Sequence, residues 1–118
     1  MPPASEVLSA LRKVRLKHHN EIALQDGIEQ ALKLAFVDHA REVRLSDSDR
    51  IDFMAGDVGI EVKVQGGAAE VERQLERYAE TGRVSSLILV TTKAQHAARI
   101  PRKLAGVDVI PFVVMDLA

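Results

Sequence analysis

The run "RVSSLILVTT" at residues 83–92 constrains the fold more than any other segment of the sequence. Its centre, Leu87 to Val90, is apolar throughout, whereas a strand with one face in water alternates apolar and polar side chains. We therefore expect a strand that is buried on both faces, which requires helices on both sides of its sheet. A chain of 118 residues has room for one such core, so a single domain over 1–118 is predicted.

Hydrophobic periodicity predicts the elements around this strand. Apolar residues recur every three to four positions between Asn20, a plausible N-cap, and Phe36, which predicts an amphipathic helix. The other predicted elements are a short helix or helical turn near 5–11, strands at 41–46, 50–54, 59–65 and 107–115, a helix at 68–81 and a short basic helix that ends near 101. Pro111 favours an edge position for the last strand. The predicted fold class is α/β, with a mixed sheet sandwiched by helices.

The hairpin predicted at 51–65 carries charges among its apolar residues. If the loop is Gly56-Asp57 or another even-numbered loop, Asp52 lies opposite Glu61, and Lys63 emerges on the same face. Two carboxylates about 5 Å apart repel each other by roughly 3 kcal/mol at an effective dielectric near 20, so a cation between them is expected. The opposite face is assigned to the core and carries Ile51, Phe53, Ile60, Val62 and Val64.

A third acidic side chain, Glu21, falls within the apolar stripe of the first long helix instead of on its solvent side. Mg²⁺ takes carboxylate oxygens and keeps several waters for chemistry, and Mn²⁺ is expected to substitute for it. Three carboxylates and Lys63 around one such ion match the hydrolysis of a phosphodiester. In that reaction Lys63 would orient the attacking water or stabilise the charge of the transition state. A first-turn glutamate that is favoured by the helix dipole is the alternative for Glu21.

The hairpin sequence resembles the motif of the PD-(D/E)XK nuclease superfamily, because Asp52 is followed after eight residues by Glu61-Val62-Lys63. The setting is also similar, with an acidic first helix, a hairpin that carries the acids, and a helix with "QLERY" before a buried strand. The resemblance covers about residues 19–92 and implies a restriction-endonuclease-like core in α-β-β-β-α-β order. It also implies Mg²⁺-dependent endonucleolytic cleavage of DNA, with Asp52 and Glu61 as metal ligands and Lys63 as the catalytic lysine.

Two more residues resemble positions of the Holliday-junction-resolvase-like and virus-type replication-repair branches of that superfamily. Glu21 in "NEIALQ" looks like their helix-one glutamate, and Gln74 is similar to a glutamine that they place near the site. The capping of a buried carbonyl explains Gln74 equally well. Ile51 stands where the motif name has proline. Structure-selective cleavage of branched or flapped DNA, or relatively nonspecific cleavage, is expected because no recognition domain is present. A catalytically inactive nucleic-acid-binding or assembly module on the same fold is the alternative, and a cross-strand salt bridge would also explain the hairpin charges.

Composition narrows the partners of the chain. A net charge of -1 does not indicate a nucleic-acid partner, but 16 Lys and Arg allow local basic surfaces. The candidates for holding a phosphate backbone, which are equally well explained as solvated faces, are Arg12, Lys13, Arg15 and Lys17 in the basic segment 1–18, and Arg99, Arg102 and Lys103 in the segment 93–118. No cysteine is present, which excludes disulfides and thiolate zinc sites, and no run approaches the roughly 20 apolar residues of a membrane span. A cytoplasmic protein without membrane contact is expected, with the apolar final strand as a candidate homodimer edge.

Several other side chains fit structural positions better than functional ones. Tyr78 is expected in the core and not as a base-stacking platform, since it lies on the apolar face of its helix. His39 and His96 are expected on the surface. His18 and His19 are adjacent and point in different directions, so they are not expected to share a metal.

Overall fold

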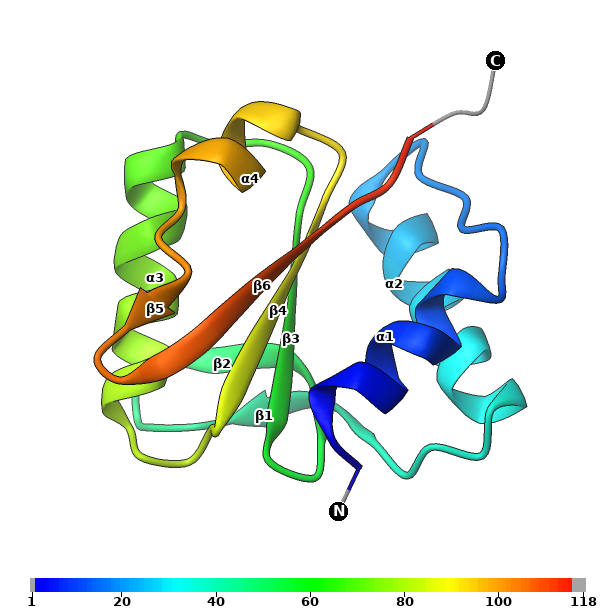
Figure 1. Ribbon diagram of the computed structural model, residues 1–118, viewed down its shortest axis with the longest axis horizontal. Helices are drawn as coiled ribbons and strands as arrows, with labels where there is room; N and C mark the ends of the chain where they lie inside the picture. Colours follow the sequence, from blue (N-terminus) through cyan, green and yellow to red (C-terminus); the bar gives the residue numbers. More distant parts are fainter. Residues whose placement is uncertain (1, 116–118) are drawn as a thin grey trace.

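A six-stranded mixed sheet with helices on both faces forms the frame of the protein (Figure 1). The computed structural model describes residues 2–115. Its helices are α1 (Ala4–Arg12), α2 (Glu21–Leu34), α3 (Ala68–Glu80) and α4 (Ala94–Arg99). Its strands are β1 (Ala40–Arg44), β2 (Arg50–Ala55), β3 (Val58–Lys63), β4 (Ser86–Thr91), β5 (Lys103–Leu104) and β6 (Val107–Val113). None of the helices among the described residues is long and apolar enough to cross a membrane.

The strands lie in the order β1-β2-β3-β4-β6-β5. β1, β2 and β3 are antiparallel neighbours, and β3, β4 and β6 run parallel to one another. β5 was not predicted and pairs only with Val107 and Asp108, at the start of β6. The Val109 N–H also bonds to the carbonyl of Arg102 at 2.9 Å. Within residues 2–115 the part of β6 beyond Val109, including Pro111, has no outer strand, in agreement with the edge position predicted for it.

The central strand β4 separates two hydrophobic clusters, as its composition predicts. All six of its residues are buried. Ile88 and Val90 pack into the cluster beneath α1 and α2, whereas Leu87 and Leu89 pack into the cluster beneath α3. Helices thus cover both faces of the sheet, and each fully buried aliphatic side chain contributes about 1.5–3 kcal/mol. The α/β architecture with flanking helices is confirmed.

The predicted start of α2 is confirmed, whereas its predicted extension to Phe36 is wrong. The side chain of Asn20 accepts a hydrogen bond of 2.8 Å from the Ala23 N–H and caps the helix as expected. The helix ends earlier than its apolar stripe suggests, because the Val37 N–H bonds to the Leu32 carbonyl at 2.9 Å and closes the last turn. Phe36 takes the left-handed position of this turn, with φ 56°, and is 95% exposed instead of buried.

The N-terminal helix α1 is more substantial than the short helix or turn predicted for it. Its nine residues bury four side chains under the sheet: Val7, Leu8, Ala10 and Leu11. These positions follow the three-to-four-residue spacing of one helix face. This short apolar face packs α1 against α2.

Candidate active site

The hairpin of β2 and β3 has the predicted register. Phe53 pairs with Ile60 and Ala55 with Val58, so the loop consists of Gly56 and Asp57 alone. Gly56 has a φ of 63°, a left-handed conformation that suits the first central residue of a tight hairpin turn. In this register the next position along β2, Asp52, lies across from Glu61.

The two strands separate at Asp52. The Val62 N–H donates to Oδ2 of Asp52 at 2.7 Å, and the Asp52 N–H donates to Oε1 of Glu61 at 3.3 Å. Carboxylates thus take the places that backbone carbonyls hold in a regular ladder. Asp52 and Glu61 are brought together as predicted, but the carboxylate of Asp52 fills the opening between the strands.

The separation of the strands at Asp52 also changes which hydrophobic cluster the side chains of β2 enter. Ile51 packs into the cluster beneath α3, whereas Phe53 packs into the cluster beneath α1 and α2. The prediction that Ile51 and Phe53 share one face is therefore wrong, because it assumed a regular strand through Asp52. Across the ladder in β1, Glu42 has a φ of 56°, a strain of about 1–3 kcal/mol for a non-glycine residue. Figure 1 shows β1 and β2 crossing β3 at a steep angle.

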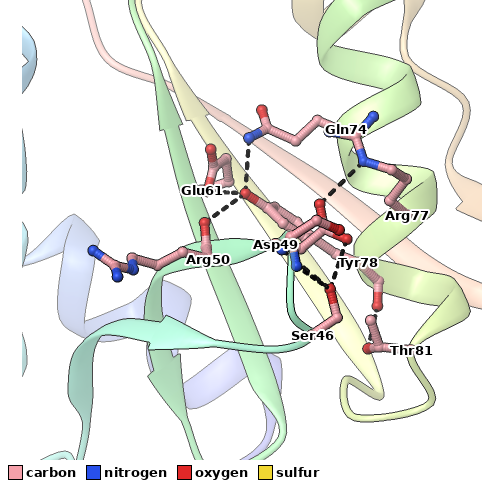
Figure 2. Close-up of polar contacts among 9 residues, drawn as sticks. Ser46, Asp49, Arg50, Glu61, Gln74, Arg77, Tyr78 and Thr81 are labelled. Atoms are coloured by element: carbon pink, nitrogen blue, oxygen red, sulfur yellow. Dashed lines mark hydrogen bonds and ion pairs between the residues drawn. The ribbon is translucent and has the colours of Figure 1, made fainter.

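A tyrosine hydroxyl and a glutamine amide support Glu61 from α3 (Figure 2). The hydroxyl of Tyr78 lies 3.2 Å from Oε1 of Glu61 and 2.9 Å from the carbonyl of Arg50, and both acceptors share its proton. Nε2 of Gln74 donates to the same hydroxyl oxygen at 2.8 Å. Tyr78 is fully buried, as predicted, but its part in the site was missed. The spacing of four residues in "QLERY", one helix turn, is the signal that links Gln74 to Tyr78.

Burial sets the electrostatics of the two acids. Glu61 is 3% exposed, and its burial, reinforced by the charge of Asp52, raises its pKa from 4.5 to about 8. Burial also raises the pKa of Asp52, partly offset by the Val62 N–H, while the charge of Glu21 raises it further. Nζ of Lys63 lies 3.5 Å from Oε2 of Glu61 and lowers the pKa of both acids. The desolvation of the two acids therefore outweighs the favourable effect of Lys63 on their charged forms.

The donor set fits Mg²⁺ through two carboxylates and not through three. Glu21 begins α2 and lines a hollow of about 580 Å³ together with Lys63. Within residues 2–115, however, no three histidine or acidic side chains converge closely enough to hold a metal ion. Asp52 and Glu61 remain as a pair of hard oxygen ligands, and Mg²⁺ is commonly bound by one or two carboxylates together with waters and a substrate phosphate.

A second hollow, of about 430 Å³, lies on the α3 side of Lys63 and is also lined by Gln74. Arg73 and Arg77 border it from successive turns of α3. Nε of Arg77 is 3.1 Å from Oδ1 of Asp49, which is buried although it falls in a predicted turn. Neither arginine was predicted as a site residue, because the sequence places both on the solvent-exposed face of their helix. Only the packing of α3 beside β3 shows that this face borders the site.

The basic residues assigned to nucleic acid lie in three places. Arg12, Lys13 and Arg15 line a hollow of about 550 Å³ together with the end of β6, and Lys17 is exposed nearby. Nη1 of Arg102 donates to the carbonyls of Ala97 and Ile100 and closes the end of α4, which gives it a structural role. Lys103 lies 3.5 Å from Asp108 within the β5–β6 pair. Arg99 is exposed on α4.

The prediction that His39 and His96 lie on the surface is wrong. The His39 side chain is 9% exposed and lies 3.2 Å from Glu29. His96 is 4% exposed, and its Nε2 lies 3.0 Å from the carbonyl of Gly66 in the turn that follows β3. Long-range packing of α4 on this turn buries His96, which the helix sequence alone does not reveal. His18 and His19 line the same hollow as Glu21.

No protein-family model matches the sequence, and no curated protein or solved structure is significantly similar to it. Function therefore has to be inferred from the residues of the site and their geometry. A buried glutamate hydrogen-bonded to the backbone of a half-buried aspartate, a lysine beside them and hollows with exposed arginines form a region suited to a divalent cation and a phosphate.

Proposed function

We propose that the protein is a metal-dependent DNA nuclease of the PD-(D/E)XK type, which hydrolyses phosphodiester bonds. The observation that carries this proposal is the meeting of Asp52, Glu61 and Lys63 at the point where β2 separates from β3. We also assign the core to the restriction-endonuclease-like class. The element order α2, β1, β2, β3, α3 and β4 supports this assignment, since it repeats the order that the sequence resemblance implies.

Asp52 and Glu61 would hold the Mg²⁺, for which Mn²⁺ would substitute. The raised pKa values of both acids support a cation at this position, because a positive charge there would offset the desolvation of the carboxylates. When bound, such an ion neutralises phosphate charge and acidifies a water. Glu21 contributes negative potential to the same place, as its effect on Asp52 indicates.

The other residues position the substrate and the acids. The Lys63 side chain is 27% exposed and borders both hollows, so its ammonium can contact a phosphate oxygen and stabilise the added charge of a pentavalent transition state. Burial and the charge of Glu61 raise the pKa of Tyr78, so its hydroxyl stays protonated and donates to Oε1 of Glu61. Gln74 fixes that hydroxyl from the preceding turn of α3. Tyr78 and Gln74 are thus positioning residues.

Cleavage assays test this proposal. Supercoiled, single-stranded and branched DNA are incubated with wild-type protein and with Lys63→Ala or Asp52→Asn in Mg²⁺, Mn²⁺ or Ca²⁺. Cleavage by the wild type and a loss of at least about a hundredfold in both variants are expected. Lys33→Ala, at an exposed lysine on α2, is the matched control and is expected to cleave normally. Equal cleavage by wild type and both variants, or no cleavage of any substrate, contradicts the proposal.

An inactive nucleic-acid-binding module on the same fold is the second candidate. The observation that favours it is the position of Glu21, which does not join Asp52 and Glu61 in a three-ligand group among the described residues. DNA binding that persists without cleavage in every metal would select this candidate.

A further inference from the structure

Two of the hollows meet at one segment of backbone. Lys63, Gln65 and Gly66, at and beyond the carboxyl end of β3, line both the hollow on the α3 side and the hollow that reaches Glu21. The hollow that reaches Glu21 also includes Thr92, which lies directly after β4. β4 runs parallel to β3. Both hollows therefore open along the carboxyl edge of the parallel strands, where α/β sheets commonly bind ligands.

A third hollow continues the series on the side away from α3. His18 lines it together with Arg12, Lys13 and Arg15, and His18 also lines the hollow that contains Glu21. The three hollows thus follow one another past Lys63, from α3 at one end to the loop after α1 at the other. In Figure 1 the turn after β3 and the end of β4 lie at the same end of the sheet.

Positive charge is found at both ends of this series. On the α3 side, the lining of the hollow contains Arg73, Arg77, Lys63 and one acidic residue, Glu70. The far hollow contains Arg12, Lys13 and Arg15, and none of the described residues in its lining is acidic. Of the described residues that line the hollow on the α3 side, none is aromatic, so contacts there would be made to phosphates and not to bases.

We propose that a polynucleotide lies along these hollows and continues on both sides of Lys63, a path that accounts for the attack on internal bonds expected of an endonuclease. Arg73 and Arg77 hold backbone phosphates on one side of the attacked bond, and the stretch from Arg12 to Arg15 holds them on the other. This inference rests on the proposed nuclease function and adds the path that the polynucleotide takes across the protein. A substrate that ended at the site would leave one of the two basic groups without a phosphate partner.

Binding to a labelled DNA duplex in EDTA tests the path without cleavage. Loss of one phosphate contact lowers the slope of log K against log salt by about 0.9, which makes the Kd about eightfold weaker at about 0.1 M salt. Arg73→Ala and Arg12→Ala are each expected to produce this change. Arg73 is chosen because it makes no ion pair with any described residue, whereas Arg77 is tied to Asp49. Arg83→Ala changes an exposed arginine that lies before β4, at the opposite end of the parallel strands, so it is the matched control and is expected to bind like the wild type.

The internal attack is tested with covalently closed circular DNA in Mg²⁺ or Mn²⁺. Nicking of the closed circle, weakened by Arg73→Ala and Arg12→Ala but not by Arg83→Ala, supports the inference. Cleavage of linear DNA alone, or a wild-type salt slope in either variant, overturns it and leaves the nuclease proposal standing. Absence of cleavage in every wild-type reaction overturns the nuclease proposal as well, so the two failures are distinguishable.

Discussion

Replacement of Glu61 by glutamine is expected to stabilise the metal-free fold at neutral pH while it abolishes cleavage. Glu61 is 3% exposed, and burial together with Asp52 raises its pKa to about 8. Glutamine has nearly the same shape and no charge. Its amide oxygen can still accept the hydrogen bond that the Asp52 N–H donates to Oε1.

The size of the effect follows from the difference in pKa between the folded and unfolded states. The unfolded chain loses the Glu61 proton near pH 4.5, and the folded protein keeps it until pH about 8. Between these values the folded state binds more protons, so its stability falls as the pH rises, by about 1.4 kcal/mol per pH unit. The accumulated loss is about 3 kcal/mol at about pH 7 and levels off above the folded-state pKa. Glu61→Gln removes this loss.

Urea unfolding in EDTA at several pH values measures the effect. The stability of the variant relative to the wild type is expected to rise by about 3 kcal/mol from about pH 4 to about pH 7. Glu80→Gln makes the same chemical change on the exposed face of α3 and is expected to show no such trend. Added Mg²⁺ is expected to stabilise the wild type and to have a smaller effect on Glu61→Gln, because binding to the folded state raises stability by mass action.

Two results would refute the reasoning. A difference between variant and wild type that stays constant with pH would mean that Glu61 is not held protonated by its surroundings. A variant less stable than the wild type at neutral pH would mean that the carboxylate is stabilised in the fold and that Lys63 fully compensates its charge.

Three further changes have defined outcomes. Tyr78→Phe removes the hydroxyl that bonds to Glu61 and is expected to lower the free energy of urea unfolding by about 1–2 kcal/mol and to slow cleavage; unchanged values for both would contradict the positioning role. Asn20→Ala removes the side-chain cap of α2 and is expected to cost about 1 kcal/mol, seen as a lower Tm in calorimetry. Gly59→Ala places a methyl group 2.6 Å from Cδ1 of Ile51 and is expected to cost about 1–3 kcal/mol in urea unfolding; wild-type stability would show that β3 has more space than described.

Features of the fold and the site that depend on residues close together in the sequence could be predicted from the sequence. The apolar run around Ile88 in β4 indicates a strand buried on both faces, and the even-numbered loop at Gly56 sets the register that brings Asp52 to Glu61. Both depend on short-range geometry, namely the two-residue repeat of a strand and the length of a turn.

Features that depend on distant contacts could not be predicted in the same way. Ile51 changes face because the hairpin bends at Asp52, and alternation along a strand cannot reveal a bend. Tyr78 was assigned to the core from its helix face, but its hydroxyl belongs to the site only because α3 packs over Glu61. His96 is buried by the turn at Gly66, 30 residues earlier in the chain.

Localisation of Mn²⁺ by anomalous diffraction from crystals of the protein grown or soaked in MnCl₂ tests the central claim most directly. The account predicts one strong peak bound by carboxylate oxygens of Asp52 and Glu61, with loss of that peak in Asp52→Asn. A well-ordered Asp52–Glu61 pair without a peak, at a Mn²⁺ concentration that supports binding elsewhere on the protein, would contradict it.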